Sequence, residues 1–136
     1  MVGGSYVVTF NWAASQQCCA AQYPGQVTDS WLVGFAPTVM APTTTAANGT
    51  TIRSTNSVTP TAQTTSGWFQ SQFAFTATAS TMVLSFLAQG SPSGQPPFSL
   101  LDGVTLVAVP EPATSAILVT GLAALFGLRR AKRRKS

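Results

Sequence analysis

Up to residue 109 the chain alternates apolar and polar residues with a period of two, which is typical of half-buried β-strands. Five segments follow this pattern: residues 5–13, 28–35, 67–79, 81–88 and 99–109. No segment before Ala113 shows the spacing of an amphipathic helix. The pattern therefore predicts an all-β fold in which antiparallel strands form a β-sandwich.

The alternation also predicts which side chains of each strand face the core. Along the first segment, one face carries Tyr6, Val8, Phe10 and Trp12. The corresponding faces of the other segments carry Trp31, Val33 and Phe35; Phe69, Phe73, Phe75 and Ala77; Met82, Leu84, Phe86 and Ala88; and Leu100, Val104, Leu106 and Ala108. Among these we expect the core to contain Phe73, Phe75, Leu84, Phe86, Val104 and Leu106.

The connections are rich in turn-forming residues. Residues 88–97 form a Gly/Pro/Ser-rich loop between the last two strands, and residues 16–26 form another loop. The Thr/Ala/Pro-rich stretch 36–66 contains either one weak edge strand near residues 50–54 or only a long loop. Residues 1–108 therefore suffice for one small domain.

After residue 109 the pattern changes to an uncharged apolar run of 16 residues, 113–128. As a helix it would span roughly 24 Å, somewhat less than the hydrocarbon core of a bilayer, and snorkelling by Arg129 and Arg130 covers part of the difference. The run is apolar on all sides, which excludes an amphipathic helix on a soluble domain. Residues 113–128 are therefore predicted to be a transmembrane helix.

Positive charge is concentrated behind this helix. Six of the seven Lys and Arg residues of the chain lie in the tail 129–136: Arg129, Arg130, Lys132, Arg133, Arg134 and Lys135. Residues 1–128 carry Arg53 against three acidic residues, so their net charge is 1 − 3 = −2. Next to a membrane helix, the basic cluster determines topology rather than binding nucleic acid, and it places residues 1–109 outside the cytoplasm.

The helix is preceded by Pro110-Glu111-Pro112, whose prolines cannot donate backbone hydrogen bonds and keep the segment extended. This order of motif, helix and basic tail over residues 109–136 resembles the PEP-CTERM sorting signal of Gram-negative, exopolysaccharide-producing bacteria. The resemblance implies that an exosortase recognises the motif and removes helix and tail, with Glu111 as substrate rather than catalyst. It also implies transit through the inner membrane to the cell surface or extracellular matrix.

The first ten residues have neither the charged start nor the apolar core of a signal peptide, so we interpret the sequence as truncated at its N-terminus. The segments Phe10–Ala14, Gly67–Ala77, Leu84–Phe86 and Leu100–Leu106, in this order, resemble the C-terminal half of a carbohydrate-binding-like jelly roll. The resemblance covers residues 4–108 and implies that the first strands are absent.

Few residues are candidates for a site. Asp102 is in phase with Leu100 and Val104, which predicts that its carboxylate faces the core. Such a carboxylate either ligates a structural calcium ion or accepts hydrogen bonds from backbone N–H groups, and we prefer the second because calcium needs more oxygen ligands. Cys18 and Cys19 allow a vicinal disulfide or bonds to partners elsewhere. The chain has no histidine, which speaks against zinc.

The same scarcity argues against an enzyme, because Asp29 and Asp102 are the only carboxylates outside the sorting motif. No cofactor is expected. We predict an exported structural protein of the cell envelope or biofilm matrix. The alternative is a carbohydrate-binding module that binds extracellular polysaccharide, which would need exposed aromatic residues. Trp12, Trp31 and Trp68 would stack on sugar rings if exposed, but core packing is the more common role of tryptophan.

Overall fold

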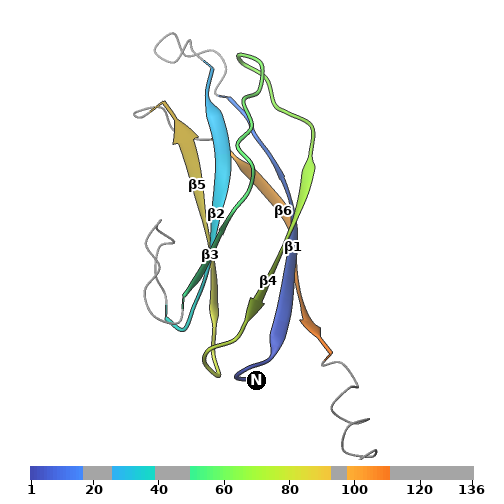
Figure 1. Cartoon of the computed structure of the whole chain (residues 1–136). Coiled ribbons are helices and arrows are strands. Elements are labelled where there is room, and N and C mark those ends of the chain that lie inside the picture. Colours follow the sequence, from blue (N-terminus) through green and yellow to red (C-terminus); the bar gives the residue numbers. More distant parts are fainter. Residues whose placement is uncertain (17–25, 39–49, 93–97, 111–136) are drawn as a thin grey trace, which may run out of the picture.

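The structure is a computed structural model that describes residues 1–16, 26–38, 50–92 and 98–110 (Figure 1). These residues form six strands and no helix: β1 (Ser5–Ala13), β2 (Thr28–Ala36), β3 (Thr51–Ser54), β4 (Phe69–Thr76), β5 (Val83–Ser91) and β6 (Leu100–Val109). The five strands expected from the alternation are confirmed. β3 decides the open question in residues 36–66 in favour of a short edge strand.

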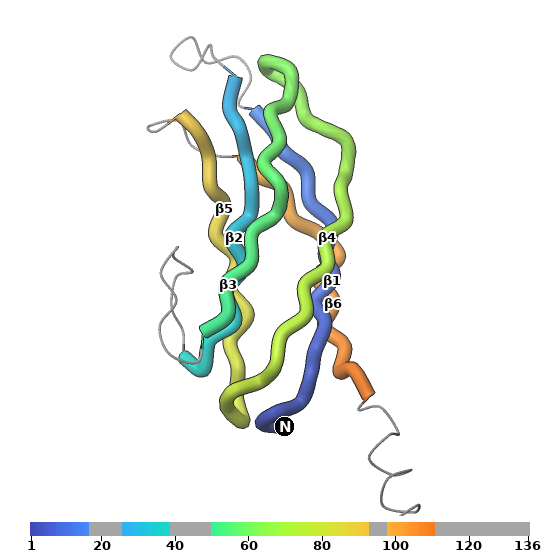
Figure 2. Tube along the Cα trace, in the orientation of Figure 1, coloured from blue at the N-terminus to red at the C-terminus, as the bar shows by residue number. Residues whose placement is uncertain are grey.

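The strands form two antiparallel three-stranded sheets, in the orders β4-β1-β6 and β3-β2-β5 (Figures 1 and 2). All strand pairs are antiparallel, which confirms the predicted all-β class. Both neighbours of β1 come from later in the chain, so the first strand lies between β4 and the last strand, β6. The jelly-roll resemblance stays a prediction, and the expected helix 113–128 lies outside the described residues.

The core lies between the two sheets and is built around aromatic rings. Phe35 of β2 stacks on Phe75 of β4 with ring centroids 4.0 Å apart, and Phe10 of β1 meets Phe86 of β5 edge-on at 5.2 Å. Phe10 and Phe35 are fully buried together with Val8, Trp12 and Val33, while Phe75 is 8% exposed and Phe86 is partly buried. The inward faces predicted for β1, β2, β4 and β5 are therefore confirmed, with Phe69 exposed at the start of β4.

The face predicted for β6 is wrong at its first residues because a β-bulge interrupts the pairing with β1. Asn11 pairs with Asp102 and Thr9 with Thr105, so two steps along β1 correspond to three along β6. The extra residue shifts the alternation by one position. Trp12, which is buried, pairs with Leu101. Leu101 therefore packs against the core, whereas Leu100 and Asp102 lie on the outer face.

The bulge centres on Gly103, which has φ +60°. A Cβ atom there would lie 3.1 Å from Nδ2 of Asn11, so both the backbone conformation and the side chain of β1 favour glycine.

Beyond the bulge, Leu106 pairs with buried Val8 and so has the inward orientation that the alternation predicts. Its burial was nevertheless wrongly predicted, because Leu106 is 51% exposed and Val104 is 44% exposed. The reason is position: β6 is the edge strand of its sheet, and no strand of the described residues pairs with its other side. Ala108 is likewise exposed.

Candidate functional site

The sorting segment begins where β6 ends. Val109, the last residue of β6, pairs with Ser5 at the start of β1, and the exposed Pro110 follows directly. The strand thus leads straight out of the end of the domain that also holds the first residues of β1 (Figure 1). Pro110 cannot extend the ladder because it has no backbone N–H. The other residues predicted for sorting lie outside the described residues: Glu111, Pro112, the run 113–128 and the basic cluster 129–136.

Within the described ranges, no helix is long and apolar enough to cross a membrane.

Asp102 is an outer-face residue and not the inward carboxylate that the alternation predicts. Its side chain is exposed, and Oδ1 accepts a hydrogen bond of 2.7 Å from the backbone N–H of the bulge residue Gly103. The bulge reverses its orientation, as described above. The calcium interpretation depended on a buried carboxylate at this position, so it loses its basis. Cys18 and Cys19, the candidates for a disulfide, lie outside the described residues.

The buried carboxylate is instead Asp29 on β2, which is fully buried. Its Oδ2 accepts a hydrogen bond of 3.1 Å from the backbone N–H of Ser15, while Oδ1 has no hydrogen-bond partner among the described residues. Burial raises the pKa of the Asp29 carboxyl, and the hydrogen bond from Ser15 opposes that rise. The sequence signal for this burial was the phase of Asp29 with the core residues Trp31 and Val33.

The three tryptophans divide into two groups. Trp12 and Trp31 are buried, and their indole nitrogens donate to Ser71 Oγ at 3.0 Å and to the carbonyl of Leu100 at 3.4 Å. They serve as core residues. Trp68, immediately before β4, is 57% exposed and is the tryptophan of this domain that solvent can reach.

Polar side chains form two rows across the outer face of the β4-β1-β6 sheet. In one row Asn11 lies between its partners Gln70 and Asp102. In the next row Thr9 lies between Gln72 and Thr105, and Gln72 Nε2 donates to Thr9 Oγ1 at 3.2 Å. Trp68 precedes Gln70 by two residues and lies just outside β4, which begins at Phe69. The arrangement offers amide, hydroxyl and carboxylate groups beside one exposed aromatic ring.

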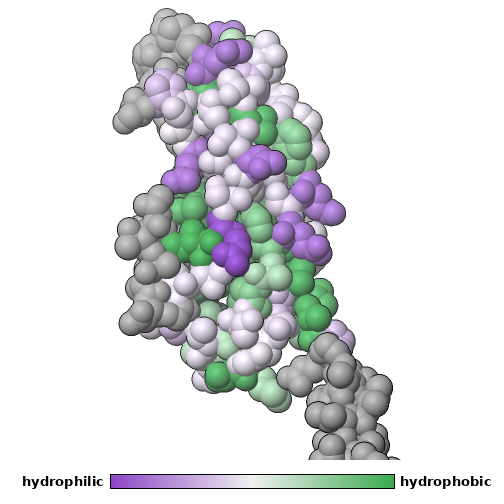
Figure 3. Space-filling model, viewed as in Figure 1, coloured by the Kyte–Doolittle hydropathy of each residue, from purple (hydrophilic) through white to green (hydrophobic). Residues whose placement is uncertain are grey.

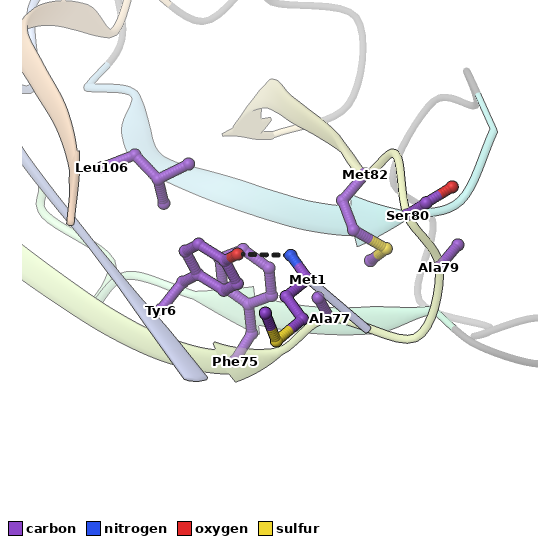
Figure 4. A pocket seen from close by; sticks show the side chains of 8 residues that line it. All are labelled: Met1, Tyr6, Phe75, Ala77, Ala79, Ser80, Met82 and Leu106. Atoms are coloured by element: carbon purple, nitrogen blue, oxygen red, sulfur yellow. Dashed lines mark hydrogen bonds between the residues drawn. The ribbon is translucent and has the colours of Figure 1, made fainter. Parts of the chain in front are cut away.

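A pocket of about 170 Å³ opens beside the inward side of β6 (Figure 4). Its lining is mainly apolar and includes Phe75 and Met82 together with Leu106. The amino group of Met1 donates to the Tyr6 hydroxyl at 2.9 Å, and Figure 4 shows the two groups pointing toward each other. The lining contains no carboxylate and no histidine, and Tyr6 is its titratable side chain.

Comparison with known proteins gives one match. A family model described as the PEP-CTERM protein-sorting motif matches residues 108–134. The chain therefore carries a PEP-CTERM sorting signal, as its C-terminal pattern predicted. This signal makes it an exported protein that passes through the membrane to the cell envelope, with an exosortase as its processing partner. No curated protein and no solved structure matches the chain.

Proposed function

We propose that this exported protein is a structural component of the cell envelope or of a biofilm matrix, and that it is not an enzyme. The observation that carries the proposal is the sorting signal at residues 108–134, which begins at the last residues of a domain whose inward strand faces are packed together. An exosortase recognises the motif Pro110-Glu111-Pro112, and the domain that precedes it is delivered to the surface.

The described part of the domain brings no reactive groups together. Asp29 is buried in the β3-β2-β5 sheet, and Asp102 is exposed on the outer face of the β4-β1-β6 sheet. Two carboxylates that flank a bond to be hydrolysed must face each other across about 5–9.5 Å of open space, an arrangement that a buried and an exposed group on opposite sheets do not make. The whole chain also lacks histidine as a general base.

Processing is tested by the C-terminal mass of the mature protein. In a native, exosortase-bearing host we expect a mature chain without the run 113–128 and the tail 129–136. In the same host without the exosortase we expect the full C-terminus ending at Ser136. A mature chain that still ends at Ser136 in the native host would show that the segment is a plain membrane anchor.

The structural role is tested by genetic complementation. Asp102→Asn removes the exposed carboxylate of the described residues and leaves the shape of the side chain unchanged. In a strain lacking the native gene, we expect this variant to restore the envelope or biofilm phenotype as fully as the unchanged chain does. A variant that accumulates normally at the surface but fails to restore the phenotype would contradict a passive role.

A second candidate function, binding of extracellular polysaccharide, is favoured by the outer face of the β4-β1-β6 sheet. Trp68 offers a ring for stacking on a sugar, and the Asn11 and Thr9 rows offer hydrogen-bonding groups beside it. In affinity electrophoresis through gels containing soluble polysaccharides, Trp68→Ala should abolish any retardation. Leu87→Ala on the opposite sheet, where Leu87 is 39% exposed, is the matched control and should leave retardation unchanged.

A further inference from the structure

The free edge of β6 is the feature that the proposed function leaves unexplained. Ten residues long, β6 pairs with β1 on one side, and no strand of the described residues pairs with its other side. An unpaired edge exposes a row of backbone N–H and C=O groups that another strand can bind. The opposite edge of the same sheet is β4, which presents Gln70 and Gln72 on its outer face.

The exposed apolar side chains of the domain gather on this strand. Of the eleven large apolar side chains exposed among the described residues, five belong to β6. Val104 and Leu106 lie on its inward side, while Val107 and Val109, 61% and 44% exposed, lie on its outer side. Figure 3 shows hydrophobic residues gathered over the end of β6, where the strand leaves the domain.

Natural edge strands are usually protected from pairing by lysine, by proline or by inward-pointing charges. From Gly103 to Val109 the strand has none of these, and apart from the hydroxyl of Thr105 its side chains are apolar on both faces. The bulge at Gly103 interrupts regular pairing at the start of the strand, which leaves the segment 104–109 as the part of the edge open to a partner.

We propose that this edge pairs with the β6 edge of a second copy of the chain, antiparallel and about a two-fold axis at Leu106. Such an interface uses the same surface of both copies, so its residues must be complementary to themselves. The register sets Val104 opposite Ala108, Thr105 opposite Val107, and Leu106 opposite Leu106 of the second copy. All of these pairs are uncharged, and the two three-stranded sheets become one six-stranded sheet.

Charge and packing both favour a second copy as the occupant. The two Asp102 carboxylates come to lie at opposite ends of the paired segment, eight residue steps or about 27 Å apart, so they do not repel each other across the axis. Leu106 lines the pocket beside Phe75 and Met82. The Leu106 side chain of the second copy would lie next to it and extend the apolar layer across the interface. The inference does not depend on the sorting reaction or on polysaccharide binding.

Disulfide trapping tests both the pairing and its register. In the full chain with Cys18 and Cys19 replaced by serine, Leu106→Cys places two thiols opposite each other at the axis. Opposed Cα atoms in an antiparallel pair are about 4.5–5.5 Å apart, within reach of a disulfide. Mild oxidation should convert most of this variant to a covalent dimer. Gln72→Cys on the opposite edge strand is the control and should remain monomeric.

The register is checked by mixing Val104→Cys with Ala108→Cys chains, which should form the mixed dimer. Val104→Cys chains alone should form little disulfide-linked dimer, because the two Val104 positions lie four residue steps apart along the paired strands, about 14 Å. Adding Val107→Lys to Leu106→Cys should lower dimer formation about ten-fold, since a charge on an edge opposes pairing. Val2→Lys, at a residue with a similar exposure of 59% but outside the strand, is the matched control and should have no effect.

Three results would overturn the proposal. One is equal trapping of Leu106→Cys and Gln72→Cys, which would indicate random collision. Another is the absence of any Leu106→Cys dimer at concentrations where the chain is soluble, as expected if a different segment or a membrane surface covers the edge. The third comes from light scattering in detergent on chains that keep both native cysteines: Val107→Lys should halve the particle's protein mass, and an unchanged mass would exclude pairing through this edge.

Discussion

Phe75→Ala should destabilise the domain more than any other single truncation on β4. Phe75 is 8% exposed, stacks on Phe35 at 4.0 Å and contacts Tyr6 at 5.6 Å, so it joins the two sheets. Truncation of a buried phenylalanine typically costs about 3–5 kcal/mol. Because Phe75 already borders the pocket of about 170 Å³, water can enter part of the new space, and we expect a cost of about 3 kcal/mol.

The measurement is urea unfolding of the full chain in detergent, followed by the fluorescence of the buried Trp12 and Trp31. With a slope of about 1.5 kcal/mol per M, the loss corresponds to a midpoint lower by about 2 M. Phe69→Ala is the matched control, because Phe69 lies on the same face of β4 but is 40% exposed. It should lower the midpoint by less than half as much. Equal midpoints for Phe75→Ala and the unchanged chain would refute the assignment of Phe75 to the core.

Three further predictions follow from single residues. Because burial raises the pKa of the Asp29 carboxyl in the folded state, the protonated side chain stabilises the fold at low pH, and this stabilisation is lost as the pH rises through the folded-state pKa. Asp29→Asn should therefore make the free energy of unfolding less dependent on pH, which is measured by comparing unfolding at about pH 4 and about pH 8. Gly103→Ala should cost about 1 kcal/mol or more in urea unfolding, because φ is +60° and Asn11 is close. Glu111→Ala should leave Ser136 as the C-terminal residue of the mature chain, read by mass spectrometry in the native host.

The period-two alternation predicts the strands and most of their inward faces because burial on one face of a sheet is a local property of each strand. It fails at Asp102 because a bulge is a property of two strands together: only the pairing of β6 with β1 shows that one residue is inserted. The glycine at 103 was the local signal, since an isolated glycine in a strand often marks a bulge.

Strand order is equally absent from the local pattern. Val104 and Leu106 are apolar and have the inward phase of core residues. They are exposed because β6 lies at the edge of its sheet, and the alternation within β6 alone does not determine that position. For the candidate site, the sorting signal was readable because it consists of contiguous residues. The outer-face rows of Asn11 and Thr9 were not, because they combine residues from three strands far apart in the chain.

The pairing of Val109 with Ser5 has a mechanical consequence. The ladder between β6 and β1 continues to the last residue before Pro110, and the two strands run antiparallel. The outcome of a pull at Pro110 therefore depends on where the domain is held. A pull opposed at Ser5, beside Val109, opens the ladder one hydrogen bond at a time, whereas a pull opposed at Ala13, at the far end of β1, acts along β6 and loads the hydrogen bonds together, in shear. While the chain is tethered through its C-terminus, the domain resists tension best when it is held at the end away from Pro110.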